Sequence, residues 1–207
     1  SFGYQDVVSE ITIEDLKSFY SNYFAPNISN FHIAGDVSKG EVLAALSRLE
    51  ADWQKKEVSM PVYSVPATPT EPQVYFVDVP QAKQSVIYMA RLTVPANDPT
   101  YSEIMVANDR LGDGSSGRLF QILREEKQFT YGAYAFPGRN AFTPSSFLAY
   151  SSVKSSTTKD ALDTFKEVFG TYAETYTEED LTKTKTAMIK ENARNFETLN
   201  NLLGILH

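Results

Sequence analysis

Cysteine is absent from the 207 residues of this sequence, and only two histidines occur, His32 and His207. Without cysteine the chain has no disulfide, no thiol nucleophile and no cysteine-based zinc site. A zinc hydrolase site takes its ligands at close spacing, and neither H-x-x-E-H nor H-E-x-x-H is present. We therefore expect this chain to bind no metal by itself. His32 is interpreted as a buried or edge residue of a strand, and His207 as a frayed terminal residue.

Basic residues are few as well: 19 Lys and Arg stand against 26 Asp and Glu, and the formal net charge is −7. This balance argues against nucleic acid as a partner, because phosphates favour a basic surface. The apolar runs are far too short for a membrane span. The first residues show neither the basic nor the apolar region of a signal peptide and contain no Met, so we expect a segment of a longer chain.

The hydrophobic content of 42% is typical of a globular protein. The first 53 residues have the pattern of half a domain. A helix is predicted from Thr12, which is followed by acidic residues, to the break before Pro26. Residues 30–34 predict a short buried strand. A capping box at Ser38 then opens a second helix, which ends near residue 53. We interpret residues 1–53 as the tail end of a preceding α/β domain.

Residues 54–72 contain Pro61, Pro66, Pro69 and Pro72 and predict an extended linker. Residues 73–207 then predict a complete substrate-binding domain. The predicted fold class is α+β, a two-layer sandwich of mostly antiparallel sheet packed against helices. Its expected strands are 74–79, 84–94, 129–136 and 145–153, and its expected helices start near residues 99, 115, 157 and 177.

A glycine-rich segment, residues 112–119, nearly matches a phosphate-binding loop. Arg118 stands where that motif needs Lys, Leu119 stands where it needs Ser or Thr, and a helix precedes it instead of a strand. We therefore interpret it as a helix-to-helix turn, with Ser115 or Ser116 as the cap of the second helix. The start of that helix has free N–H groups that can hold a carboxylate or a peptide carbonyl.

Arg124 and Tyr131 come shortly after this turn. Taken alone, they are a surface charge and a strand residue, and both are ordinary. Arg124 is expected in the last turns of a helix, however, and Tyr131 early in the next strand. Both side chains can then face one groove and present a guanidinium fork and a phenol to a peptide backbone.

Two stretches resemble a known family. SSGRLFQILREEKQFTYGAYAF, residues 115–136, closely resembles the C-terminal-domain signature of the insulinase/pitrilysin zinc peptidases, in which a Tyr follows an Arg by seven positions. FYSNYFAPNISNFHIAGDVSKGEV, residues 19–42, resembles the segment that joins one domain of these enzymes to the next. The likeness covers most of residues 10–200, in matching order.

The resemblance implies a division of labour. Such enzymes are built from repeated α/β domains in two halves that close over an unfolded peptide, and H-x-x-E-H in one half binds zinc. The implied role of Arg124 is to bind substrate backbone carbonyls, and that of Tyr131 is to donate to the developing oxyanion. The implied cofactor is zinc in the complete enzyme, bound by a domain absent here. The implied partners are that zinc-bearing half, on the same chain or a separate subunit, and peptide substrates. The fragment alone is expected to be inactive.

Two other functions remain open. The chain can be a non-catalytic scaffold of the same fold, as in the core subunits of respiratory complexes, or a stand-alone peptide-binding module that uses a sheet edge. For Tyr134 and Tyr150, a place on a peptide-binding edge and a place in the core fit equally well. The resemblance alone suggests the bacterial periplasm or cell envelope as location.

Overall fold

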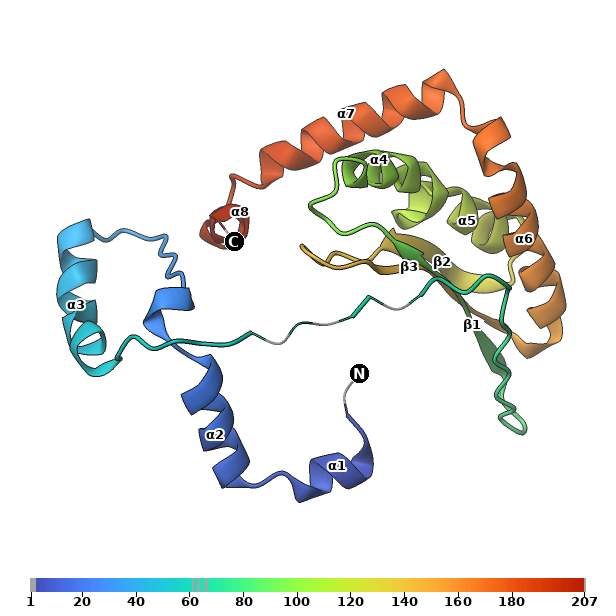
Figure 1. Cartoon of the computed structure of the whole chain (residues 1–207). Helices are drawn as coiled ribbons and strands as arrows, with labels where there is room; N and C mark the ends of the chain where they lie inside the picture. The colour runs from blue at the N-terminus through green and yellow to red at the C-terminus, as the bar shows by residue number, and fades with distance from the viewer. Residues whose placement is uncertain (1–2, 61, 63, 66, 207) are drawn as a thin grey trace. The chain divides into compact units, whose positions relative to one another are not determined.

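A computed structural model describes residues 3–60, 62, 64–65 and 67–206 (Figure 1). By its contacts the chain forms two compact units: unit 1 comprises residues 1–63 and 191–207, and unit 2 comprises residues 64–190. The domain boundaries predicted from the sequence, after residue 53 and before residue 73, stay a prediction. Pro61, Pro66 and His207 lie outside the described residues. Among the helices of the described ranges, none is both long and apolar enough to cross a membrane.

Unit 1 is built of short helices. The capping box predicted at Ser38 is confirmed, with Glu41 as its partner at the start of α3. At Thr12, where a helix start was predicted, the structure also has a capping box, with Asp15 as the partner at the start of α2. In each box a hydroxyl accepts from a backbone N–H, and an acidic side chain accepts from the cap. The helical elements are α1 (Gln5–Glu10), α2 (Ile13–Tyr23), η1 (Pro26–Ile28), α3 (Lys39–Asp52) and α8 (Leu199–Leu206), of which α1 and α8 were not predicted.

The prediction of a strand at residues 30–34 is wrong. This segment is irregular, and Phe31 and Ile33 are 68% and 42% exposed. His32 is exposed too, so its interpretation as a buried strand residue is also wrong. Alternating apolar residues predict burial on a sheet, but a strand needs a neighbour for its backbone hydrogen bonds. Within the part of the chain that the structure describes, no segment pairs with this one.

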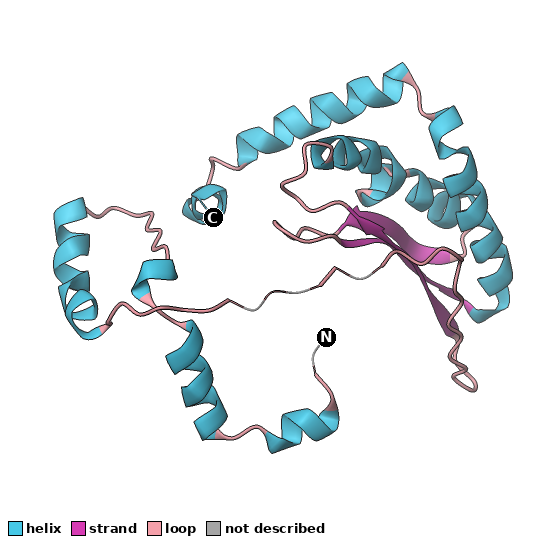
Figure 2. Ribbon diagram, in the orientation of Figure 1, coloured by secondary structure: helices cyan, strands magenta, loops and turns pink. Residues whose placement is uncertain are grey.

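Unit 2 contains a three-stranded antiparallel sheet in the order β1–β3–β2. The strands are β1 (Gln84–Thr93), β2 (Thr130–Pro137) and β3 (Ser145–Lys154), close to three of the four predicted segments. Figures 1 and 2 show α4, α5 and α6 on one side of this sheet. The predicted α+β class, with helices layered on an antiparallel sheet, is confirmed. The helical elements are α4 (Tyr101–Gly112), η2 (Gly114–Ser116), α5 (Arg118–Phe120), η3 (Gln121–Glu126), η4 (Ser155–Thr157), α6 (Thr158–Thr175) and α7 (Glu178–Arg194).

The strand predicted at residues 74–79 is not formed either. A turn closed by the Ala82 N–H to the Val79 carbonyl, with Gln81 at φ 64°, reverses the chain before β1. The segment before the turn pairs with no other described segment, and its apolar side chains are exposed, Val74 by 91% and Phe76 by 84%. Sequence pattern identifies a segment suited to a sheet, whereas the ladder depends on a neighbour in the right place.

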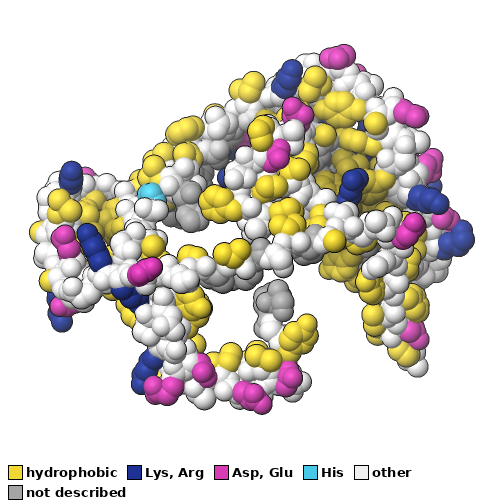
Figure 3. Space-filling model, in the orientation of Figure 1, with side chains coloured by type: hydrophobic (Ala, Val, Ile, Leu, Met, Phe, Trp, Pro, Cys, Tyr) yellow, Lys and Arg dark blue, Asp and Glu magenta, His cyan; other side chains and the backbone are white. Residues whose placement is uncertain are grey.

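The sheet has one buried face and one open face. On the helix side, Ile87, Ala149 and Val153 are buried together with Leu123 and Phe165 from the helices. The alternate side chains point the other way, because successive residues of a strand face opposite sides. Val86 and Tyr88 of β1 are accordingly 58% and 64% exposed, and Figure 3 shows hydrophobic side chains on the surface formed by β1 and the turn before it.

The helix starts differ in detail from the predicted ones. The helix predicted to start near residue 99 is α4, whose cap is Thr100; the Asp98 carboxylate accepts from the N–H and hydroxyl of Thr100. Ser115 and Ser116 lie in the η2 turn, and Gly117 precedes α5. The helix predicted to start near residue 115 consists of α5 followed by η3, a π-helix.

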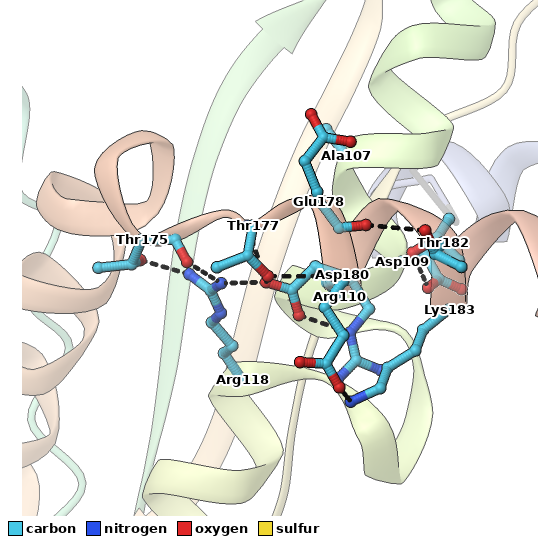
Figure 4. Close-up of polar contacts among 12 residues, drawn as sticks. Ala107, Asp109, Arg110, Arg118, Thr175, Thr177, Glu178, Asp180, Thr182 and Lys183 are labelled. Carbon is cyan, nitrogen blue, oxygen red and sulfur yellow. Dashed lines mark hydrogen bonds and ion pairs between the residues drawn. The ribbon is translucent and has the colours of Figure 1, made fainter.

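Asp180 joins the helices of unit 2 (Figure 4). Its carboxylate accepts from Arg118 at 2.9 Å, from Arg110 at 3.4 Å, and from the Thr177 N–H and hydroxyl at 3.0 and 2.9 Å. Arg118 also donates to the Thr175 carbonyl at 2.5 Å, and its guanidinium lies 4.8 Å from the centre of the Tyr172 ring. Burial alone would raise the pKa of the Asp180 carboxylate. The hydrogen bonds from Thr177 and Arg118 outweigh this effect and lower the pKa to about 2.

We predict that Asp180→Asn lowers the free energy of unfolding by about 2 kcal/mol at pH 7, because it leaves two partly buried arginines without their carboxylate. Because the pKa of Asp180 is lower in the folded state, its ionised carboxylate stabilises the fold at pH values above the ordinary pKa of 3.8. This stabilisation is lost as the pH falls toward 2. In urea denaturation, the free energies of unfolding of the wild type and of Asp180→Asn should therefore approach each other as the pH is lowered between those values. Asp163→Asn, in an exposed ion pair with Lys159, is the matched control and should leave the midpoint unchanged. A constant difference at all pH values would contradict this account.

Candidate functional site

Arg124 lies in the π-helix η3, which follows α5 without interruption. The Lys127 N–H donates to the Ile122 carbonyl at 2.9 Å, five residues back, as is typical of a π-turn. Leu123 is fully buried and fixes this turn to the core, while Arg124 beside it is half-buried. Gln128, with φ 56°, then turns the chain into β2. Short π-segments are frequent at functional sites because they redirect one side chain without ending the helix.

Tyr131 is the second residue of β2 and is 84% exposed. The Arg124 Cζ lies 5.9 Å from the centre of the Tyr131 ring, within the range of a cation–π contact. The structure thus brings the two predicted site residues together. Their roles toward a substrate remain a prediction.

The polar atoms of these two side chains are not engaged by the rest of the described chain. Among the described residues, none forms a hydrogen bond or an ion pair with the Arg124 guanidinium or with the Tyr131 hydroxyl. Arg118 offers the contrast, because its guanidinium is bound to Asp180 and to Thr175. The donors of Arg124 and Tyr131 are therefore available to a ligand.

A row of tyrosines crosses the open face of the sheet from the same strand. Tyr134 of β2 and Tyr88 of β1 both lie opposite Tyr150 of β3, with ring centres 5.6 and 6.0 Å from it. The ring of Tyr134 covers Gly132, where a Cβ would come within 2.7 Å of ring atoms. Tyr134 and Tyr150 are thus half-buried in a row on the open face and do not belong to the core on the helix side.

The glycine-rich segment is a helix-to-helix turn, as predicted. It ends α4 at Gly112, and η2 leads to Gly117 and α5. Gly112 is required by packing, since a Cβ there would lie 2.3 Å from the Ala135 backbone nitrogen. Arg118, at the lysine position of the phosphate-loop pattern, is bound to Asp180.

Within the residues that the structure describes, no group of three or more His, Cys, Asp or Glu side chains gathers where it could hold an ion. One apolar hollow of about 420 Å³ lies apart from Arg124 and Tyr131, and its lining residues are Ser102, Glu103, Val106, Ala107, Tyr172, Ala173, Tyr176 and Leu181.

Comparison with known proteins gives the family. A family profile described as "Peptidase M16 inactive domain" matches residues 10–188. The chain belongs to this peptidase M16 family. The resemblance to the C-terminal-type region of insulinase/pitrilysin peptidases is confirmed by this match. No curated protein sequence matches the chain.

Solved structures share the fold of this M16 chain. They include a peptidase M16 inactive domain from Pseudomonas fluorescens, with 21% identity and a TM-score of 0.81, and a protease from Helicobacter pylori, with 17% and 0.83. A conserved protein from Enterococcus faecalis has 15% identity and a TM-score of 0.59. They match 99%, 99% and 98% of this chain, which covers 48%, 50% and 47% of theirs. The chain thus spans about half the length of these proteins.

We predict that tetranitromethane, which attacks phenolates, nitrates Tyr131 at least about tenfold more than Tyr172 in the folded protein. Tyr131 is exposed, whereas the Tyr172 hydroxyl donates to the Ala107 carbonyl at 2.5 Å and burial raises its pKa well above the usual range. Mass spectrometry of tryptic peptides measures both sites in one sample. Equal modification of the two, before unfolding, would show that Tyr131 is not free.

Proposed function

We propose that this chain is the substrate-binding, non-zinc portion of a zinc-dependent metalloendopeptidase. The observation that supports it most is the pairing of a half-buried guanidinium with an exposed phenol, whose donors are not engaged by any described residue. The family match supports the class of the parent protein, and the description "inactive domain" agrees with a contribution other than the metal chemistry. Because the chain spans half of its structural relatives, activity is a property of a larger assembly.

In this proposal Arg124 binds the backbone of the peptide. A peptide segment offers carbonyl oxygens at fixed spacing, and a guanidinium fork can donate two parallel hydrogen bonds to them. Leu123, which is fully buried, and the following turn hold the base of the side chain, so little conformational freedom is lost on binding. The Tyr131 ring beside the guanidinium restrains it further without using its N–H donors.

Tyr131 then acts on the reacting carbonyl. Its hydroxyl donates a hydrogen bond to the oxygen on which negative charge develops, and such a donor stabilises the transition state more than the ground state. Zinc, held by a partner half, supplies the Lewis acid when it is bound. Peptide hydrolysis therefore requires both halves.

A scaffold of the same fold is the second candidate. A subunit that only assembles has no need of a guanidinium that forms no ion pair with any described residue, and it is for this reason that we favour the peptidase. The two functions separate in experiment: in a scaffold, substitutions at Arg124 or Tyr131 leave proteolysis unaffected, whereas in the peptidase they reduce it and leave assembly intact.

In the complete enzyme, Tyr131→Phe is expected to lower kcat by about one to three powers of ten with a smaller change in KM, as for loss of an oxyanion donor. Hydrolysis of a fluorogenic peptide measures both constants. Tyr4→Phe, which removes a hydroxyl from another exposed tyrosine, is the control. The chain without its zinc-bearing half should hydrolyse nothing. A kcat within about twofold of wild type would exclude the oxyanion role.

At Arg124, Ala and Lys substitutions distinguish charge from shape. Arg124→Ala should raise KM, and Arg124→Lys should restore only part of the loss, because an ammonium group cannot form the two parallel hydrogen bonds. Arg48→Lys, at a side chain 92% exposed, controls for the exchange itself. If Arg124→Lys matches the wild type in kcat/KM, the fork is not used.

A further inference from the structure

The side of the sheet on which Tyr131 lies is set by an irregularity in β2. Thr130 lies opposite Val153 and Ala133 lies opposite Ser151, so three steps along β2 match two steps along β3. One extra residue in one strand is a β-bulge, and it bends the strand and redirects the side chains next to it.

The bulge exchanges the two faces at this point. In a regular strand Tyr131 would share the face of Ala133, which is fully buried against the helices, and Thr130 would face outward. The structure has the reverse, since Thr130 is 8% exposed and Tyr131 is 84% exposed. Tyr131 therefore reaches the open face, beside Arg124, only because the bulge is present.

Two buried hydroxyls bind the backbone of the bulge. The Thr130 hydroxyl lies 2.6 Å from the Ser152 carbonyl oxygen, the Ser151 hydroxyl lies 2.8 Å from the Gly132 carbonyl oxygen, and the Gly132 N–H donates to Thr130 Oγ1 at 3.1 Å. Each hydroxyl has one proton, and this arrangement satisfies all three backbone groups at once. The two hydroxyl oxygens lie 3.0 Å apart.

These hydroxyls are unusual in their surroundings. Ser151 is fully buried, and its strand neighbour Val153 and the helix residue Leu123 are fully buried apolar residues. A hydroxyl in such a place is unfavourable unless it is hydrogen-bonded. Here the bonds go to backbone groups that the bulge has displaced from the regular ladder, so hydroxyl and bulge stabilise each other.

We propose that Thr130 and Ser151 are positioning residues, whose buried hydroxyls hold the β-bulge that directs Tyr131 outward to Arg124. Their effect on catalysis rests on the function proposed above, whereas their effect on the geometry does not. Neither residue touches the substrate; both act through the backbone of residues 130–132.

The test uses four variants of this chain. Thr130→Val removes the hydroxyl and keeps the branched shape, Thr130→Ser keeps the hydroxyl, and Ser151→Ala removes the second hydroxyl. Thr164→Val is the matched control, because Thr164 is 4% exposed in the same unit and its hydroxyl donates to the Asp160 carbonyl of its own helix. NMR spectra of each variant report the NOE between the Tyr131 ring and the Arg124 side chain.

We expect Thr130→Val and Ser151→Ala to lose this NOE while the NOEs of Phe165 in the core persist. Thr130→Ser and Thr164→Val should keep it. An NOE of wild-type intensity in both Thr130→Val and Ser151→Ala would overturn the proposal, as would its loss in Thr164→Val. Two variants that remove different hydroxyls are measured, so that if one does not fold the other still decides.

Activity of the complete enzyme separates this proposal from the function on which it builds. If both are right, Thr130→Val lowers kcat about as much as Tyr131→Phe, and the double variant is no worse than either single one. If Tyr131→Phe has no effect on kcat but the NOE is lost in Thr130→Val, the positioning stands and the catalytic role of Tyr131 fails. If the NOE survives, the positioning fails whatever the activity.

Discussion

Strand β2 satisfies two packing requirements at once, and the structure of unit 2 depends on both. On its helix side it carries Ala133 and Ala135, whose small side chains let α4 approach until Gly112 meets the Ala135 backbone. The buried Asn108 amide donates to the Ala135 carbonyl at 2.8 Å, which satisfies a group of this edge strand. Its other side must present Tyr131 to solvent. Regular alternation cannot meet both requirements, because residues 131, 133 and 135 would then share one face.

Two arginines near the glycine-rich turn show how the fold separates structural from available charge. Arg118 is held by Asp180 and Thr175 and lies over the Tyr172 ring, so its donors connect α5 to the ends of α6 and α7. Arg124 lies about one and a half helical turns later, and its only described partner is an aromatic ring. The partly buried Asp180 carboxylate neutralises the first charge, while the second stays available for carbonyl oxygens. In an acidic protein, an arginine that forms no ion pair with any described residue is the stronger candidate for binding a ligand.

Much of the secondary structure follows from local chemistry. The helix starts at Thr12 and Ser38 are found where they were expected, because a cap involves residues only three apart. The two strands that do not form, 30–34 and 74–79, have the composition of strands but lack a neighbour in the described part of the chain. Pairing depends on residues far away in sequence, which a local pattern does not contain. The π-helix at residues 121–126 escaped prediction for a similar reason, since its helical pattern is unchanged by one wider turn.

Residue order alone was enough to establish the class of fold, the membership of the M16 family, the lack of an H-x-x-E-H motif, and the pair Arg124 and Tyr131 seven residues apart. The outward direction of Tyr131, in contrast, depended on the folded chain. Periodicity assigns a strand residue to a face only if the register is regular, and the bulge interrupts it between Thr130 and Ala133. The hydroxyls of Thr130 and Ser151 that hold this bulge come from two strands and lie 21 residues apart in sequence, so only folding could bring them together.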